Sequence, residues 1–271
     1  MNPPPAVRTR DACLAYGDRV LWDGLNLDIE QGQFVAILGS NGSGKTSLLK
    51  VLLGERTLTR GEAWIAGRPI TRGSTAVGYV PQKISIDDGT MIKARDLVRM
   101  GLDGHRWGFG LAAPRTRRAV RADLDELLAS VGAASFSGAP VSMLSGGELQ
   151  RVRVAAALAA NPSILLCDEP LAALDLRHQQ EVAALLDQRR REHGTAVLFV
   201  THDINAVLEY VDQVLYLANG QFRLGTPAEV LTSAGLTELY GAPVDVLEAQ
   251  GRLIVVASND PAAGYHVGPH L

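Results

Sequence analysis

The fold is decided by Phe34-Val-Ala-Ile-Leu-Gly39-Ser-Asn-Gly-Ser-Gly-Lys-Thr46, which continues as Ser47-Leu-Leu-Lys-Val-Leu-Leu53. Five apolar residues predict a buried strand, and the second segment has a helical pattern. Between them lies the pattern G-x-x-x-x-G-K-T, whose backbone N–H groups can surround phosphates at a helix N-terminus. A chance match in a Gly-rich turn would lack the flanking strand and helix. The predicted phosphate-binding residues are Gly39, Ser40, Asn41, Gly42, Ser43, Gly44, Lys45, Thr46 and Ser47.

Two residues of this loop have distinct predicted roles. Lys45 reaches the β- and γ-phosphates of a nucleotide, and the Thr46 hydroxyl is a ligand for Mg²⁺. The expected cofactors are therefore ATP and Mg²⁺.

The arrangement of apolar segments along the chain predicts an α/β fold. Short runs rich in Val, Ile and Leu alternate with longer helical patterns, which is typical of a mainly parallel sheet covered by helices. Residues 6–35 and 61–80 interrupt the alternation and predict a small antiparallel sheet with glycine turns, while residues 90–160 are mainly helical. The expected core strands span residues 33–38, 163–167, 195–200 and 213–218. One helix has an apolar face made of Val120, Leu124, Leu127, Leu128 and Val131 and ends near Gly132.

Composition excludes several classes of protein. The chain has 271 residues, 46% of them hydrophobic, and a net charge of −3. It therefore lacks the strong positive field typical of nucleic-acid binding, and no nucleic acid is expected as a partner. The two cysteines, Cys13 and Cys167, lie in apolar stretches, which predicts reduced thiols in a cytosolic protein. The Pro-rich start is not a secretory signal, and the longest apolar segment is too short to span a bilayer.

Polar residues follow two of the predicted strands. Asp168 and Glu169 come directly after a buried strand, and His202 follows the next core strand along the chain. At the carboxyl edge of a parallel sheet, Asp168 can hold Mg²⁺ and Glu169 can orient or deprotonate the attacking water. His202 can donate a hydrogen bond to the γ-phosphate. Taken singly, these acids fit a solvated strand end, and the histidine an ordinary polar residue.

A second glycine-containing helix start occurs at Leu144-Ser145-Gly146-Gly147-Glu148. Ser145 and Glu148 form the capping-box pattern S-x-x-E, which is a sufficient structural explanation for those two residues. It does not explain Gly146 and Gly147, since each glycine in a helix costs up to about 1 kcal/mol relative to alanine. A close phosphate would explain them. Because one ATP cannot need two distant cradles in one chain, the pattern predicts a head-to-tail homodimer with ATP at the interface.

Taken in order, these motifs resemble the nucleotide-binding subunits of ATP-binding-cassette (ABC) transporters, over roughly residues 6–256. The resemblance adds three residues: Tyr16 as the aromatic that stacks on adenine, Gln82 as the Q-loop residue that senses Mg²⁺ and the γ-phosphate, and Asp175 as the D-loop residue that contacts the opposite subunit. The usual LSGGQ signature reads LSGGE here. Glu148 thus places a negative charge near a phosphate unless its side chain folds back as a cap.

The resemblance also implies an organisation. The fold is expected to be a phosphate-loop NTPase core with an N-terminal antiparallel β subdomain and an inserted helical subdomain at about residues 84–160. Residues 1–256 would form a single ABC ATPase domain, followed by a flexible tail at 257–271. His266 and His270 of this tail could bind metal or be inert.

A lone cassette looks like the ATPase of an importer that pairs with separate membrane permeases. Segments near residues 85–88, 95–101 and 240–256 are similar to cassettes for zinc, manganese or iron uptake. The expected partners are integral-membrane permease subunits and an extracytoplasmic solute-binding protein, at the cytoplasmic face of the membrane. The alternatives are an exporter ATPase and a soluble ABC ATPase acting on nucleic acid. Relatives acting on nucleic acid carry tandem cassettes or long coiled-coil insertions, whereas here each motif occurs once and only 62 residues separate Gln82 from Ser145.

Overall fold

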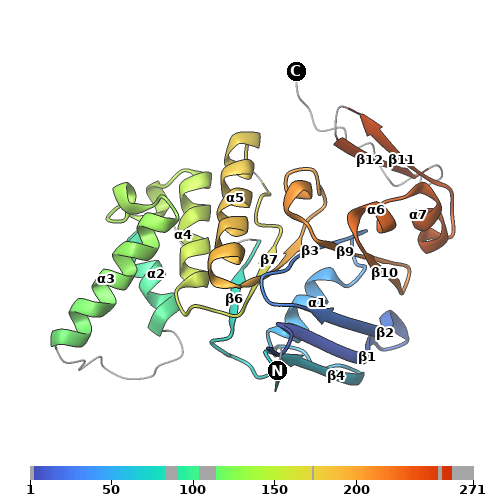
Figure 1. The fold of residues 1–271 in the computed structure, drawn as a ribbon, viewed down its shortest axis with the longest axis horizontal. Coiled ribbons are helices and arrows are strands. Elements are labelled where there is room, and N and C mark those ends of the chain that lie inside the picture. The colour runs from blue at the N-terminus through green and yellow to red at the C-terminus, as the bar shows by residue number, and fades with distance from the viewer. Residues whose placement is uncertain (1–2, 83–90, 104–113, 173, 250–251, 258–271) are drawn as a thin grey trace.

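A computed structural model describes residues 3–82, 91–103, 114–172, 174–249 and 252–257, and its centre is a six-stranded sheet (Figure 1). Neighbouring strands β3, β8, β7 and β6 are parallel, β9 is parallel to β3, and β10 is antiparallel to β9. The four predicted core strands are confirmed to within one residue at each end. In spatial order the sheet contains β10 (Gln221–Gly225), β9 (Gln213–Ala218), β3 (Phe34–Gly39), β8 (Ala196–Val200), β7 (Ile164–Asp168) and β6 (Val77–Val80).

Both faces of this sheet are buried, which is why its strands are almost uninterrupted apolar runs. Along β3, Phe34, Ala36 and Leu38 enter one apolar core, whereas Val35 and Ile37 enter the other. Helix α5 (Leu176–His193) packs on the first face, and α1 (Lys45–Leu52) packs on the second. The period-two alternation thus fixes strand β3, and the phosphate loop after it, between two cores.

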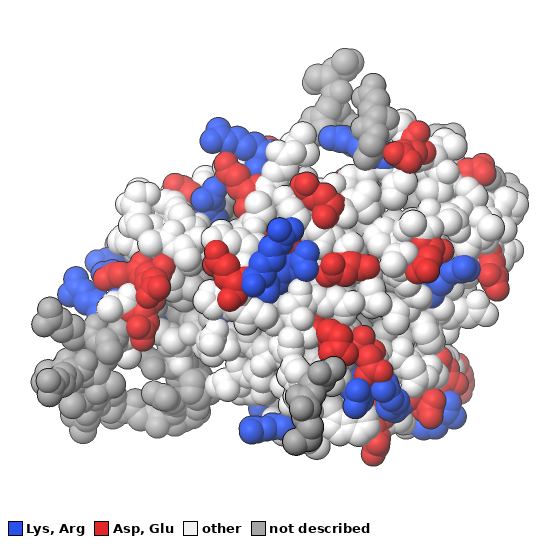
Figure 2. Space-filling view, in the orientation of Figure 1, with Lys and Arg blue, Asp and Glu red and all other residues white. Residues whose placement is uncertain are grey.

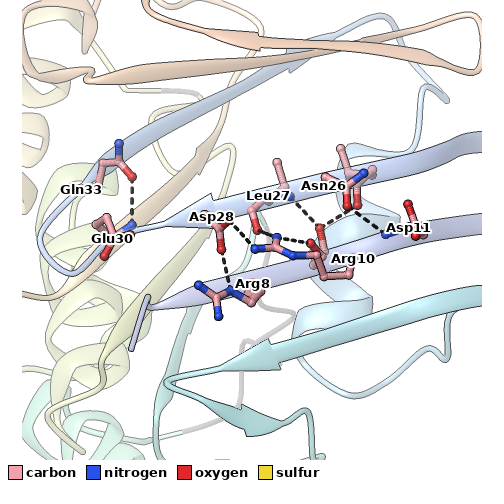
Figure 3. A network of polar contacts seen from close by, with 10 residues as sticks. Arg8, Arg10, Asp11, Asn26, Leu27, Asp28, Glu30 and Gln33 are labelled. Carbon is pink, nitrogen blue, oxygen red and sulfur yellow. Dashed lines mark hydrogen bonds and ion pairs between the residues drawn. The ribbon is translucent and has the colours of Figure 1, made fainter. Parts of the chain in front are cut away.

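An antiparallel sheet covers α1 and contains the N-terminal part of the chain (Figure 1). Its strand order is β2 (Arg19–Ile29), β1 (Val7–Tyr16), β4 (Arg60–Ile65) and β5 (Arg68–Pro69). On its exposed surface, Arg8 and Arg10 each bind one carboxylate oxygen of Asp28 on the neighbouring strand, at 2.7 and 2.6 Å (Figure 3). Such exposed pairs contribute little stability, so the sheet is held mainly by its buried inner face.

The prediction that residues 61–80 belong entirely to the antiparallel sheet is wrong for the last strand. Residues Val77–Val80 form β6, which pairs in parallel with β7 at the edge of the central sheet. Gly78 lies inside this strand, where an added Cβ would be 2.3 Å from the Ala157 carbonyl oxygen. This glycine therefore permits close approach of a helix rather than a turn, and a four-residue strand carries too little periodicity to reveal its partner.

Residues 90–160 are mainly helical where described, as predicted, and build a third small core. Helices α2 (Ala94–Asp103) and α3 (Pro114–Ser130) pack with α4 (Gly146–Leu158), and the 3₁₀ turns Ala134–Phe136 and Val141–Met143 connect the last two. Leu124, Leu128 and Val131 are buried in this core, which confirms the predicted apolar face. Because α4 also contributes Val154 to the central core, it joins the helical insertion to the sheet.

The C-terminal part contains elements that the sequence analysis missed. After the 3₁₀ turn Leu208–Tyr210 and strand β9 come β10, α6 (Pro227–Val230), α7 (Ser233–Tyr240) and a hairpin of β11 (Val244–Ala249) and β12 (Arg252–Ala257). Asn219 and Gly220, both with positive φ, form the β9–β10 turn. An Asn-Gly dipeptide between apolar runs is a hairpin signal that would have predicted β10. The expected tail at 257–271 begins at the last residue of β12, and the remainder, with His266 and His270, lies outside the described residues.

Cys13 and Cys167 are free and buried, as predicted. Within the described ranges, no helix is long and apolar enough to cross a membrane. On the face shown in Figure 2, acidic and basic side chains are interspersed.

Candidate functional site

The phosphate loop lies at the carboxyl end of β3 and leads directly into α1. Gly39 has φ +139°, and an added Cβ would lie 2.0 Å from the carbonyl oxygen of Leu217 on β9. Gly44 is the left-handed N-cap of α1, and its α-carbon lies against the Trp22 indole, which an added Cβ would approach to 2.9 Å. Only glycine fits both positions, so the loop wraps tightly around the helix N-terminus.

Lys45 is held inside this loop. Its Nζ donates hydrogen bonds to the carbonyl oxygens of Gly39 at 2.7 Å and Ser40 at 2.9 Å. Burial lowers the pKa of the ammonium group, and the attraction of Glu169 and Asp168 opposes this effect. The Ser43 hydroxyl is buried and has no hydrogen-bond partner among the described residues. A cation bound only to carbonyls and an unpaired hydroxyl make this loop suitable for an anionic phosphate group.

Asp168 at the end of β7 is the candidate metal-binding carboxylate. Its Oδ1 is 3.4 Å from the Thr46 hydroxyl and its Oδ2 is 3.5 Å from the Tyr79 hydroxyl. Burial, followed by repulsion from Glu169, raises the pKa of Asp168, while the hydrogen bonds from Thr46 and Tyr79 act in the opposite direction. The pKa of Tyr79 is raised to about 12, chiefly by burial and then by Asp168.

The donor set fits Mg²⁺. A hydroxyl and a carboxylate oxygen lie side by side, and hard oxygen ligands with few protein groups are typical of magnesium bound to a nucleotide. Among the described residues, no group of three or more His, Cys, Asp or Glu side chains forms a dedicated metal site. A metal held here would therefore depend on phosphate oxygens for its remaining ligands.

Glu169 connects the ends of three parallel strands. It has φ +49°, a conformation that is costly for a residue with a side chain and is common at active sites. Its Oε2 accepts a hydrogen bond of 2.5 Å from Gln82 Nε2, and its Oε1 lies 2.5 Å from His202 Nε2. Gln82 follows β6 and His202 follows β8, so the strand order brings these three predicted residues together.

These residues line one cleft with the phosphate loop. The cleft has a volume of about 590 Å³ and is lined by Tyr16, Arg19, Leu21, Asn41, Gly42, Gly44, Lys45, Thr46, Ser47, Gln82, Glu169 and His202. It therefore combines a cationic phosphate cradle, a carboxylate and an aromatic ring. Such a combination can bind a nucleotide and hold a water molecule beside its terminal phosphate.

Tyr16, which ends β1 and lines this cleft, is 41% exposed. The guanidinium carbon of Arg56 lies 4.0 Å from the ring centroid, and the Tyr16 hydroxyl is 3.4 Å from the Ser47 hydroxyl. Arg19 donates a hydrogen bond of 3.0 Å to the Gly42 carbonyl. Arg19, Arg56 and Tyr79 were not predicted from the sequence, because none of them belongs to a recognisable motif and only the fold brings them to the site.

The second glycine motif lies elsewhere. Ser145 caps α4, and the predicted capping box is present: the backbone N–H and the hydroxyl of Ser145 donate to Glu148 Oε2 at 2.9 and 2.8 Å. These hydrogen bonds lower the pKa of Glu148. Its carboxylate is therefore folded back onto the helix start. Among the described residues that line the cleft, none comes from Ser145, Gly146, Gly147 or Asp175, so one chain does not bring them to its own phosphate loop.

Comparisons with known proteins agree with this site. The family model described as ABC transporter matches residues 22–172. The chain is 36% identical to the hemin import ATP-binding protein HmuV of Streptomyces coelicolor, over 96% of this chain and 94% of the relative. It is 34% identical to the zinc import ATP-binding protein ZnuC of Halorhodospira halophila, over 88% and 84%. For the iron(3+)-hydroxamate import ATP-binding protein FhuC of Bacillus subtilis, the identity is 32% over 89% and 90%.

Solved structures are similar over the same region. A metal-chelate type ABC transporter in an inward-facing conformation superposes with a TM-score of 0.76 at 27% identity, covering 93% of this chain and 97% of that one. A dimeric post-hydrolysis ATP-binding cassette with ADP and phosphate gives 0.68 at 28% identity, covering 81% and 98%.

Proposed function

Because the chain belongs to the ABC transporter family of ATPases, we propose that it powers the import of a metal cation or metal chelate through a separate membrane permease. The relatives named above import hemin, zinc and iron-hydroxamate, which supports a cargo of this class. The observation that carries the ATPase role is Glu169, held between Gln82 and His202 beside the Lys45 loop.

The chemistry follows from the positions of these side chains. Lys45 and the loop N–H groups bind the phosphates, and Thr46 with Asp168 would hold Mg²⁺, which neutralises phosphate charge when bound. Glu169 lies where it can accept a proton from the attacking water, and Gln82 and His202 fix its two oxygens. His202 also supplies a hydrogen-bond donor for the γ-phosphate.

We extend the proposal to a head-to-tail homodimer. The exposed Ser145 and Gly146 lie outside the chain's own cleft, so a second copy is needed to present them to the nucleotide. The dimeric cassette structure with ADP and phosphate supports such an assembly. Asp175 would contact the partner copy, and Glu148 would remain folded back so that its charge does not face the phosphate.

The wider assembly is part of the same proposal. Residues 1–256 act as one ATPase domain, and the helical insertion at about 84–160 responds to Gln82. The complex would lie peripherally at the cytoplasmic face of the membrane, with permease subunits and an extracytoplasmic solute-binding protein. The mixed surface charge visible in Figure 2 gives no support for the nucleic-acid alternative.

Co-expression with the cognate membrane permease tests this proposal. We expect the two proteins to co-purify, and we expect ATP hydrolysis to rise when the permease is present in lipid vesicles loaded with the cargo-binding protein. Uptake of radioactive zinc, ferric hydroxamate or hemin then identifies the cargo. Hydrolysis that ignores the permease but rises with added DNA or RNA would refute the importer role, and cargo movement out of the cell would establish export.

A further inference from the structure

In the proposed dimer, the segment that begins at Ser145 and the segment that contains Asp175 both face the partner copy. Within one chain, the side chain of His178 contacts both segments. We use the name signature turn for Ser145–Glu148. A Cβ added to Gly147 would lie 2.4 Å from Cδ2 and 2.9 Å from Cγ of His178, in the first turn of α5. The imidazole ring of His178 therefore occupies the space that a side chain at Gly147 would need.

The two glycines of the signature turn consequently differ. Gly147 is buried, and the contact with His178 within the same chain explains why it has no side chain. Gly146 is exposed, and a Cβ there would meet only a Leu174 methyl group at 3.6 Å, an ordinary contact. Among the residues that the structure describes, no neighbour requires a glycine at position 146, so Gly146 is the better candidate for close approach by an external group.

The imidazole of His178 also forms a hydrogen bond to Asp175, the D-loop residue. His178 Nδ1 lies 2.8 Å from Asp175 Oδ1, and the same oxygen accepts the His178 backbone N–H at 2.9 Å. Because a carboxylate oxygen only accepts hydrogen bonds, Nδ1 carries the proton. One side chain thus contacts the signature turn through its ring and Asp175 through its nitrogen.

We propose that His178 is a positioning residue that couples the signature turn to Asp175, so that the chain presents both segments to the partner's nucleotide as one unit. This inference rests on the head-to-tail dimer of the proposed function. His178 touches neither the phosphate loop nor the carboxylate of Glu169. It acts through Gly147 and Asp175, and its loss should affect assembly of the composite site rather than nucleotide binding by one chain.

Helix capping alone does not account for this arrangement. Asp175 needs only the backbone N–H of residue 178 to cap α5, and every residue except proline offers that group. The imidazole adds a contact to a different helix, α4, which a cap does not use. A purely capping role therefore predicts an effect on stability alone.

The test uses the full chain carrying Glu169→Gln, in which slow hydrolysis lets an ATP-bound dimer accumulate. Sedimentation measures dimer formation in Mg²⁺-ATP, and a fluorescent ATP analogue measures nucleotide binding by the monomer. We expect His178→Ala to weaken the dimer about tenfold while the monomer's nucleotide affinity stays within about twofold. His178→Asn, which keeps a donor for Asp175, should recover part of the dimer affinity. His193→Ala, at the far end of α5, is the matched control and should change neither value.

A second measurement isolates the ring contact. Gly147→Ala should lower the melting temperature, and adding His178→Ala should restore part of the loss, since removal of the ring makes room for the new methyl group. Normal dimerisation of His178→Ala, or no stability recovery in the double variant, would refute the coupling. If the Glu169→Gln chain itself fails to dimerise in Mg²⁺-ATP, the dimer model is wrong and the inference is refuted with it.

Discussion

Replacing Glu169 by Gln is the change whose consequence the structure defines best. The substitution keeps the shape of the side chain and one carbonyl oxygen that can accept the 2.5 Å hydrogen bond from Gln82. The other oxygen becomes an amide NH₂, which faces His202 Nε2 and can donate to it when that nitrogen is unprotonated. The cleft should thus keep its geometry and lose only the ability to accept a proton from water.

The expected loss follows from that single function. General-base catalysis contributes roughly 10²–10⁴ to a rate, which corresponds to about 2.7–5.4 kcal/mol in the activation barrier. We expect kcat to fall within this range and the affinity for Mg²⁺-ATP to change by less than about threefold, because Lys45 and Thr46 are untouched.

Phosphate release at saturating Mg²⁺-ATP measures the effect, with nucleotide binding measured on the same preparation. Glu238→Gln is the matched control, since Glu238 is an exposed partner of Arg223 far from the cleft. A kcat within about fivefold of the parent protein would refute the role assigned to Glu169.

Three further predictions concern stability and nucleotide binding. Burial and the adjacent carboxylate of Glu169 raise the pKa of Asp168 above its usual value of 3.8, so ionisation of Asp168 opposes folding. Asp168→Asn should therefore raise the melting temperature of the nucleotide-free protein at pH 7, by a margin that shrinks as the pH falls towards 3.8. Equal melting temperatures at pH 7 would contradict this. Gly39→Ala should destabilise the fold by about 1–3 kcal/mol or more in urea denaturation, because the new Cβ would meet the carbonyl oxygen of Leu217 on β9. Gly73→Ala should cost less, because an added Cβ there would have nothing within 4 Å. Arg56→Ala should raise the KM for ATP about two- to fivefold at constant kcat, because the cation–π contact at 4.0 Å that orients Tyr16 contributes about 0.5–1 kcal/mol. An unchanged KM would exclude a role for Arg56 in orienting Tyr16.

Much of this fold could be predicted from local pattern. The strand before the phosphate loop alternates between two cores, and the runs ending at Asp168 and Val200 have the same character. Parallel pairing then places Glu169 and His202 at one sheet edge, so the catalytic cluster follows once the fold class is known. The capping box of Ser145 was predictable for the same reason, since its two members are three residues apart.

The errors concern features that depend on distant parts of the chain. Strand β6 takes its place from pairing with β7, and its four residues do not encode that choice. Arg56 and Tyr79 reach the site from strands or turns with no motif of their own. The steric limit at Gly147 was also missed, because it comes from the ring of His178, 31 positions later, which an added Cβ would meet. Local patterns therefore identify the motifs, whereas the structure is required to explain why particular residues occupy them.

The dependence of the hydrolysis rate on protein concentration tests the composite active centre most directly. If two chains complete each site, the rate at saturating Mg²⁺-ATP should rise with the square of the chain concentration below the dimer dissociation constant and become linear above it. Sedimentation at the same concentrations should show the dimer appearing in parallel. A rate that stays strictly proportional to concentration, from a protein that sediments only as a monomer, would contradict the account.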